Sequence, residues 1–241
     1  MVMMNDDHLR KALIGAVFFV ITACVISQIM MQLGGGERDD PLTFDGNVVD
    51  ETLGTEEIEF EDGLPPFISS AGGFYPERAI FDAGIGIGGL LMMAFSFELY
   101  HRTKPVERHQ KIANICGLIS GIVIGFSMFN IIAYPFNTEF DMHIFWAMII
   151  FVGAQFWAIC LTVARSQIDY ELTWKDWQVN NLRWILFASI FVSFHAMLLL
   201  VMNGYVIASA VFEWLLMISS QFYLLTFVPT LSKGGSVVSK N

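Results

Sequence analysis

Apolar and polar residues follow one another along this chain in long blocks rather than with a helical or strand period. Six apolar blocks of about twenty residues are separated by polar segments, of which one is long. A bilayer core of about 30 Å needs roughly 20 apolar residues per helix, so each block predicts one transmembrane helix. The predicted spans are Ala12–Leu33, Ala79–Leu99, Ile112–Tyr134, Met142–Ala164, Leu182–Met202 and Val206–Val228.

The apolar residues surround each span on all sides, which argues against amphipathic helices that lie on a membrane surface. The first block is long and lacks a small-residue cleavage site, so it is interpreted as a retained helix rather than a removed signal peptide. The sequence therefore predicts an all-α, polytopic membrane protein. Its six-transmembrane-helix bundle occupies residues 1–241 as a single membrane domain.

The composition agrees with this prediction, because 55% of the residues are apolar and only 15% are charged. A soluble domain has about 25% charged residues. The basic residues then predict the orientation, since cytoplasmic loops carry the excess of Lys and Arg. With the N-terminus inside, eleven of the 13 Lys and Arg residues lie inside, and only Arg38 and Arg78 lie outside. We therefore expect both termini on the cytoplasmic side.

The net charge of −10 is concentrated in one long acidic outer loop, Gly34–Arg78, which holds twelve Asp and Glu residues. This distribution argues against nucleic acid as a partner, because such binding depends on positive charge. The first half of the loop, up to Asp62, is expected to be mobile. From Pro66 to Glu77 the loop is rich in proline, glycine and aromatic residues. This composition predicts an ordered cap over the outer mouth of the bundle, and the alternative is an ordinary turn into the second helix.

Small residues recur at spacings that favour close helix packing in lipid. The third span carries Gly117, Gly121 and Gly125, and the second span carries Gly84, Gly86, Gly88 and Gly89. These glycine-rich faces predict contacts within the bundle, and the alternative is a homodimer or another protein partner. The three cysteines, Cys24, Cys116 and Cys160, lie in spans without disulfide or zinc spacing and are interpreted as buried structural residues.

Polar residues inside a bilayer are costly and usually functional. Five of them fall in the outer half of five different spans: Asp82, Asn130, His143, His195 and Glu213. They are candidates for a polar cluster that binds a lipid headgroup or a small solute. A purely structural network and a zinc site remain alternatives, but no HExxH motif or nucleophile elbow is present and the spacing requires no metal or cofactor.

Glu213 is the strongest single candidate, because it is the one formal charge in the last span. A buried carboxyl group needs a cation or hydrogen-bond donors. His195 lies eight residues before the tight turn at Asn203–Tyr205, and Glu213 lies eight residues after it. The two side chains are therefore expected at similar height, and we predict a contact between them, either direct or through water.

Several short motifs resemble those of the DRAM/FRAG/Sfk family of six-span membrane proteins, which includes the damage-regulated autophagy modulators. The stretch before the second span is similar to the family's outer-loop motif, through Pro66, Phe67, Ile68, Ser69, Ser70, Ala71, Gly72, Pro76 and Glu77. His143 and the pair Glu213-Trp214 also match. Ser70 stands where the family often has Asp, and the acidic segment Gly34–Asp62 has no counterpart in the family pattern.

The resemblance implies a regulatory or organising role in membrane-lipid homeostasis or autophagy, with membrane lipids as partners. It also leaves open a lipid-modifying enzyme of the hydrolase or GPI-anchor remodelling type, and the sequence alone leaves open a small-solute transporter. The lack of a duplicated half or of Pro-broken helices argues against transport. Family members are found in the plasma membrane or in endomembranes such as the lysosome and Golgi, which is the localisation expected here.

Overall fold

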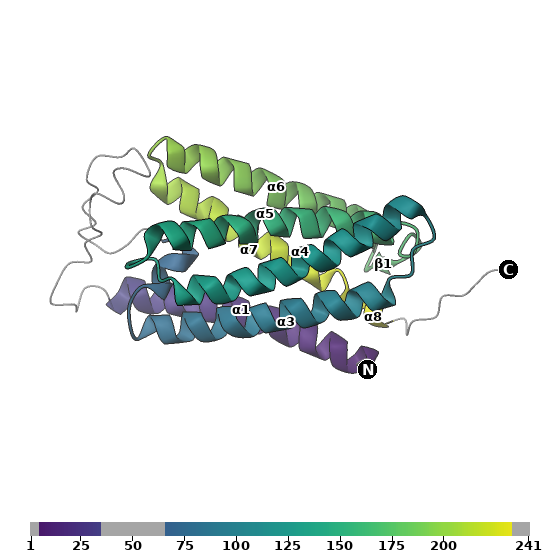
Figure 1. The fold of residues 1–241 in the computed structure, drawn as a ribbon, viewed down its shortest axis with the longest axis horizontal. Helices are drawn as coiled ribbons and strands as arrows, with labels where there is room; N and C mark the ends of the chain where they lie inside the picture. The colour runs from purple at the N-terminus through teal and green to yellow at the C-terminus, as the bar shows by residue number, and fades with distance from the viewer. Residues whose placement is uncertain (1–4, 35–65, 233–241) are drawn as a thin grey trace.

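A computed structural model describes residues 5–34 and 66–232, so the acidic first half of the long loop lies outside the described residues. The described chain is almost entirely helical (Figure 1). Its elements are α1 (Asp6–Gly34), η2 (Ile68–Gly72), α3 (Glu77–Arg102), α4 (Arg108–Ala133), α5 (Phe140–Arg165), β1 (Thr173–Trp174), β2 (Trp177–Gln178), α6 (Val179–Met202), α7 (Val206–Leu225) and α8 (Val228–Ser232).

The predicted six-span fold is confirmed, since six of these helices are long and apolar enough to cross a membrane. Most of them extend beyond the predicted apolar blocks. α1, for example, begins at Asp6 rather than Ala12, because polar and charged residues continue a helix into the interface that an apolar count leaves out. The last predicted span is divided at Thr226–Phe227 into α7 and α8.

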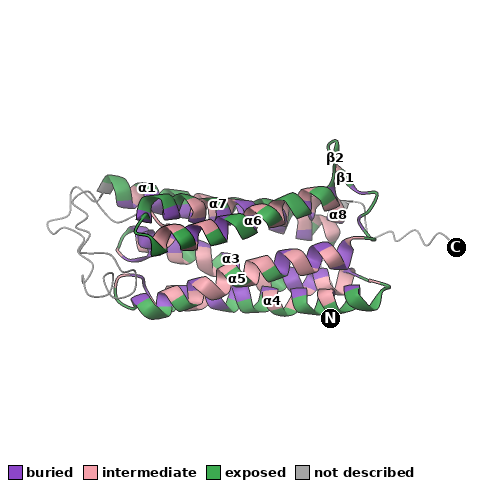
Figure 2. Ribbon diagram, turned by 90° about the horizontal axis from the view of Figure 1, so that it is seen from above, coloured by how far each residue is buried: buried purple, intermediate pink, exposed green. Residues whose placement is uncertain are grey.

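The six long helices form a ring in chain order, because each packs against the next and α1 packs against α7. Figure 2 shows α6 and α7 on one side of the ring and α3, α4 and α5 on the other. The start of α1 and helix α8 lie at one end of the bundle, here called the terminal end (Figure 1). The segment with η2 lies at the opposite end, here called the cap end.

Glycines allow the closest approach between α3 and α4. A Cβ atom added at Gly125 would lie 2.6 Å from the Gly89 carbonyl oxygen, and one added at Gly121 would lie 2.5 Å from the Ser96 Cβ. Gly84 faces Ala23 of α1 in the same way, at 2.4 Å. The glycines of these faces therefore pack inside the bundle, as the packing interpretation expects.

Two of the connections between the long helices have different structures. Gly204 turns the chain between α6 and α7 with φ 78°, a conformation that glycine adopts without strain. The predicted antiparallel packing of these two helices is present. Between α5 and α6, the strands β1 and β2 pair Trp174 with Trp177 in a small hairpin that the apolar pattern does not reveal. The membrane orientation of both ends remains a prediction from the basic residues.

Candidate functional site

The predicted contact between Glu213 and His195 is wrong. His195 lies on the exposed side of α6, where its ring packs against Phe191 and its Nδ1 lies 2.8 Å from the Phe191 carbonyl oxygen. The buried side of α6 carries Ile190 and Phe194 instead. His195 and Glu213 are equally far from the turn in sequence, but the rotation of α6 places the His195 side chain on its exposed side.

Asp82 and Asn130 also have partners within their own helices. The Arg78 Nε donates to an Asp82 carboxylate oxygen at 3.2 Å, one helical turn away. The Asn130 amide donates to the Phe126 carbonyl oxygen at 2.9 Å. Arg78 directly precedes the predicted span Ala79–Leu99, one helical turn before Asp82.

His143 is buried near the start of α5. Its Nδ1 lies 2.8 Å from the Tyr134 carbonyl oxygen, and its ring packs edge-on against Phe136. These contacts fix the turn between α4 and α5. Within the described part of the chain, no hydrogen bond or ion pair joins any two of the five predicted residues. Each of the five residues instead has its own separate partner.

Glu213 instead holds the segment that precedes α3. Its buried carboxylate accepts a hydrogen bond from the Ile68 backbone N–H at 2.8 Å. The neighbouring Trp214 indole donates to the Pro66 carbonyl oxygen at 2.9 Å, and the Gln28 amide donates to the Phe67 carbonyl oxygen. Three consecutive backbone groups are thus fixed by side chains from α1 and α7.

These contacts order residues Pro66–Glu77, here called the cap segment. Its centre is the short helix η2, in which Ser70 and Ala71 are fully buried. Gly72 lies against Phe81, where an added Cβ would come within 2.7 Å of the ring. Pro76 follows a cis peptide bond and precedes α3, and Glu77 is buried in the first turn of α3. The family-like residues therefore build one packed element at the cap end.

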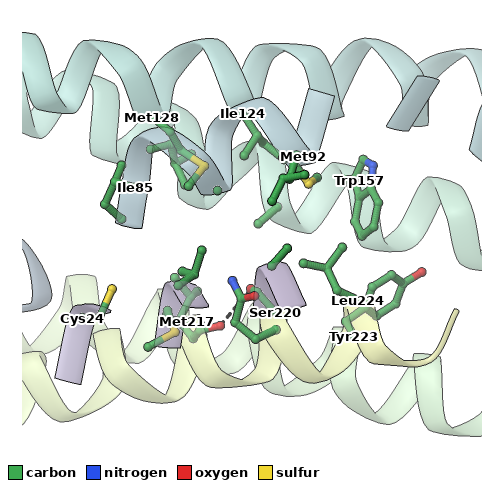
Figure 3. Close-up of a pocket in the computed structure, with 18 of the residues that line it drawn as sticks. Cys24, Ile85, Met92, Ile124, Met128, Trp157, Met217, Ser220, Tyr223 and Leu224 are labelled. Carbon is green, nitrogen blue, oxygen red and sulfur yellow. Dashed lines mark hydrogen bonds between the residues drawn. The ribbon is translucent and has the colours of Figure 1, made fainter. Parts of the chain in front are cut away.

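An elongated cavity of about 220 Å³ lies inside the ring, beneath the cap segment. All six long helices and η2 contribute to its wall. Figure 3 shows side chains of α3, α4 and α5, among them Met92, Met128 and Trp157, facing Met217 and Leu224 of α7 across the space. The cavity is far larger than the about 10–15 Å³ that one water needs. It was not foreseen from the sequence, because its existence depends on how the helices pack.

The wall of this cavity is almost entirely apolar. Its polar groups are few, and three of them, Ser69, Glu213 and Cys24, lie at the cap end. The lining residues on α1 extend from Leu9 to Cys24. At 1.5 Å per residue this distance is about 22 Å, a large part of the ~30 Å hydrocarbon thickness. The cavity is therefore long, narrow and apolar.

A network of buried polar side chains, which the sequence analysis did not predict, lies at the terminal end. Arg165 donates to both carboxylate oxygens of Asp169, at 2.7 and 2.9 Å, and Arg183 donates to the same carboxylate at 2.7 Å. Arg183 is fully buried and also donates to the Thr226 hydroxyl at 3.0 Å. Arg165 reaches the Thr103 hydroxyl at 2.8 Å. This network ties the loop after α5 to α6, α7 and the end of α3.

Burial by itself would raise the pKa of Asp169, but the guanidinium groups of Arg165 and Arg183 outweigh it and hold this pKa below its ordinary value. Asp169 is therefore a carboxylate at neutral pH. One sequence signal could have revealed the network, since Arg183 lies inside an apolar block and Asp169 follows Arg165 by one helical turn.

The cysteines are only partly as predicted. Cys24 is buried, whereas Cys116 is exposed and Cys160 is intermediate, so the interpretation of all three as buried residues is wrong. Within residues 5–34 and 66–232, no group of three His, Cys, Asp or Glu side chains has the geometry to hold a metal ion.

The architecture can now be set beside known proteins. Comparisons with curated proteins and with solved structures find no match. A family model described as the Frag1/DRAM/Sfk1/Cwh43P N-terminal domain matches residues 17–233, which include all six long helices in whole or in large part and the cap segment. This match confirms the resemblance seen in the short motifs. The chain is an integral membrane protein that belongs to the Frag1/DRAM/Sfk1/Cwh43P family.

Proposed function

We propose that this protein regulates or organises membrane lipids without chemically modifying them, and that its central cavity binds an acyl chain of a bilayer lipid. The observation that carries this proposal is the long apolar cavity of about 220 Å³ inside a ring of transmembrane helices. Of the two roles that the family resemblance implies, lipid homeostasis and autophagy, the cavity supports the first directly.

The chemistry of the wall favours an acyl chain. Burial of apolar surface contributes about 0.8 kcal/mol per CH₂, so a chain along the wall gains affinity without hydrogen bonds. A volume that is small for a length of about 22 Å suits a slender, flexible chain better than a rigid plate of fused rings. A hydrated solute would have to lose its water to enter a space with so few polar partners.

The structure also changes which residues are proposed to bind. We favour the cavity over the five-residue outer cluster, because each member of the cluster has a separate partner in the described part of the chain. Met92, Met128 and Trp157 replace it as binding residues, since they line the cavity and methionine adapts well to irregular apolar ligands. Glu213 contributes by fixing the cap segment, which includes the lining residues Ile68 and Ser69.

The test compares lipid bound by purified variants. Ala154→Phe places a ring in the cavity from α5, whereas Val152→Phe adds a similar bulk to the 37% exposed Val152 on the outer side of the same helix. After purification in a mild detergent, native mass spectrometry measures the fraction of molecules that carry a lipid. If the new ring displaces two CH₂ groups of the acyl chain from the cavity, at ~0.8 kcal/mol each, lipid binding by Ala154→Phe should be roughly tenfold weaker.

The control variant should retain lipid at the wild-type level, and both variants should unfold at a temperature close to that of the wild type. Equal lipid occupancy in the wild type and in Ala154→Phe would exclude the cavity as the binding site. Conversion of the bound lipid by the wild-type protein would instead support the enzyme alternative and contradict this proposal.

A further inference from the structure

The line of contact between α1 and α3, here called the seam, is tightly packed toward its cap end. Gly84 of α3 lies so close to Ala23 of α1 that an added Cβ would be 2.4 Å from the Ala23 Cβ. One turn further, a Cβ at Gly88 would lie 2.7 Å from the Val20 side chain. Small residues thus bring the two helices into direct contact in the half of the membrane that contains the cap segment.

The same seam is joined again at its terminal end by charged residues. Arg102, in the last turn of α3, forms an ion pair with Asp6 in the first turn of α1. The Arg102 Nε also lies 3.3 Å from a carboxylate oxygen of Glu98. This cluster connects the two helix ends at the membrane interface, where charged side chains remain hydrated more easily than inside the bilayer.

Between these two junctions the wall of the cavity is thin. Ala12 and Ala16 of α1 and Leu91 and Ala94 of α3 line the cavity from the two sides of the seam. None of the four is buried: Ala94 is exposed, and the other three are intermediate. Three of these four side chains are single methyl groups, which fill less of the space between the two helices than a larger side chain would.

The depth of this thin wall matches the acyl region of a bilayer. Counted from Asp6, Ala12 and Ala16 lie about 9 and 15 Å along α1, at 1.5 Å per residue. Counted from Arg102, Ala94 and Leu91 lie about 12 and 17 Å along α3. The four residues therefore lie beside the lipid tails, between the ion pairs at the terminal end and the contact of Ala23 with Gly84 toward the cap end.

We infer that this part of the seam is a lateral portal, through which one acyl chain of a bilayer phospholipid passes between the membrane and the cavity. The headgroup stays at the interface of the terminal end, because the portal has no polar wall that could replace its water. Only a flexible chain fits a passage bounded by three alanines and a leucine. This inference rests on the proposed lipid-binding function and adds to it a route and a leaflet.

The experiment measures lipid exchange in nanodiscs made of phosphatidylcholine. The cavity is first loaded with a phosphatidylcholine that carries a photoreactive diazirine in one acyl chain, and an excess of unlabelled lipid is then added. Light at increasing delays cross-links whatever labelled chain remains, and mass spectrometry measures cross-links to cavity residues such as Met92 and Met128. The decay of these cross-links gives the exchange rate.

Two variants narrow the portal, and two matched controls do not. Ala16→Trp and Ala94→Trp place a large ring at the thin wall, one from each helix. Phe18→Trp and Leu90→Trp change residues that are 71% and 57% exposed on the same two helices but do not line the cavity. A portal predicts about tenfold slower exchange in the first pair, equivalent to ~1.4 kcal/mol of added barrier, and wild-type rates in the second pair.

The outcomes separate the portal from the function. If the cavity residues cross-link in the wild type but both alanine variants exchange at the wild-type rate, the portal is wrong and lipid binding stands. If cavity residues are never cross-linked in the wild type, the lipid-binding function fails and the portal fails with it. Slow exchange in Leu90→Trp as well as in Ala94→Trp would show a general effect of bulk on α3 and would also overturn the portal.

Discussion

The two ends of the bundle each contain a buried carboxylate, but they stabilise it by different means. At the cap end, Glu213 accepts a hydrogen bond from a backbone N–H and fixes the short segment that precedes α3. At the terminal end, Asp169 accepts hydrogen bonds from two arginines. The comparison teaches that one carboxylate orders a single segment locally, whereas the other joins several helices through paired charges.

The two ends also differ in what surrounds them. Glu213 lines the apolar cavity, together with Ser69 and Cys24, so the cap end is one boundary of the proposed lipid site. The Asp169 network contains no residue that lines the cavity, and it includes only side chains that already have partners in the protein. We therefore assign binding to the space between the ends and a structural role to the terminal end.

The largest predicted effect is the presence or absence of protease cleavage, which decides which end of the bundle faces the cytoplasm. The basic residues predict that the terminal end does. A protease site inserted between Lys104 and Pro105 should remain uncut in sealed right-side-out vesicles, whereas one inserted beside Gly204 should be cut. The reverse pattern would invert the predicted orientation. We also predict that a protease added outside cuts within the acidic segment Asp39–Asp62, which lies outside the described residues, so this segment is an independent probe of the same question.

Breaking the terminal network should have the next largest effect. Arg183→Met removes one cation from Asp169 and leaves its carboxylate partly unpaired in a buried site, which costs about 3–5 kcal/mol. The midpoint of thermal unfolding in detergent should fall strongly. Lys175→Met, in the turn of the β1–β2 hairpin, changes a basic residue outside the network and should leave the midpoint unchanged. A wild-type midpoint for Arg183→Met would contradict the structural role of this end.

Acid should weaken the terminal end selectively. The pKa of Asp169 is lower in the folded protein than its ordinary value of about 4, so the ionised form stabilises the fold. Its contribution is fully present above about pH 5 and is lost as the pH falls through the lowered pKa. The stability difference between the wild type and Asp169→Asn should therefore be constant near neutral pH and shrink in acid. A difference that grew in acid would contradict this sign.

The smallest predicted effect distinguishes hydrogen bonding from charge at the cap end. Glu213→Gln retains an oxygen that can accept from the Ile68 N–H, so it should unfold within about 1 kcal/mol of the wild type. Glu213→Leu leaves that N–H without its acceptor and should cost about 1–3 kcal/mol. Hydrogen exchange at the Ile68 amide should accelerate in the Leu variant alone. Unchanged protection in the Leu variant would show that Glu213 does not fix the cap segment.

The sequence allowed a good prediction of the elements and a poor prediction of their rotation. Each span is apolar on all sides, so no polar stripe marks the face that turns inward. His195 lies on an exposed face of α6, whereas Glu213 is buried and contacts Ile68, so the predicted contact between them fails. The packing of Gly121 and Gly125 was predictable, because small residues at a fixed spacing are a local signal.

The cavity and the terminal network could not be predicted for a different reason. A cavity is a space that neighbouring side chains fail to fill, so no single residue such as Met92 announces it. Arg183 was counted with the cytoplasmic basic residues, although its position inside an apolar block is costly without a partner. Its partner Asp169 comes from a loop fourteen residues earlier, and only the folded chain brings the two together.

The central claim is that a lipid chain occupies the space inside the ring. The most direct test maps the cross-links that a diazirine-bearing phosphatidylcholine forms in nanodiscs at equilibrium. The account predicts cross-links to Met92, Met128 and Leu224, which line the cavity, and their loss in Ala154→Phe. Cross-links confined to residues on the outer surface, such as Leu90 and Val152, would show that lipid only surrounds the bundle and would contradict the account.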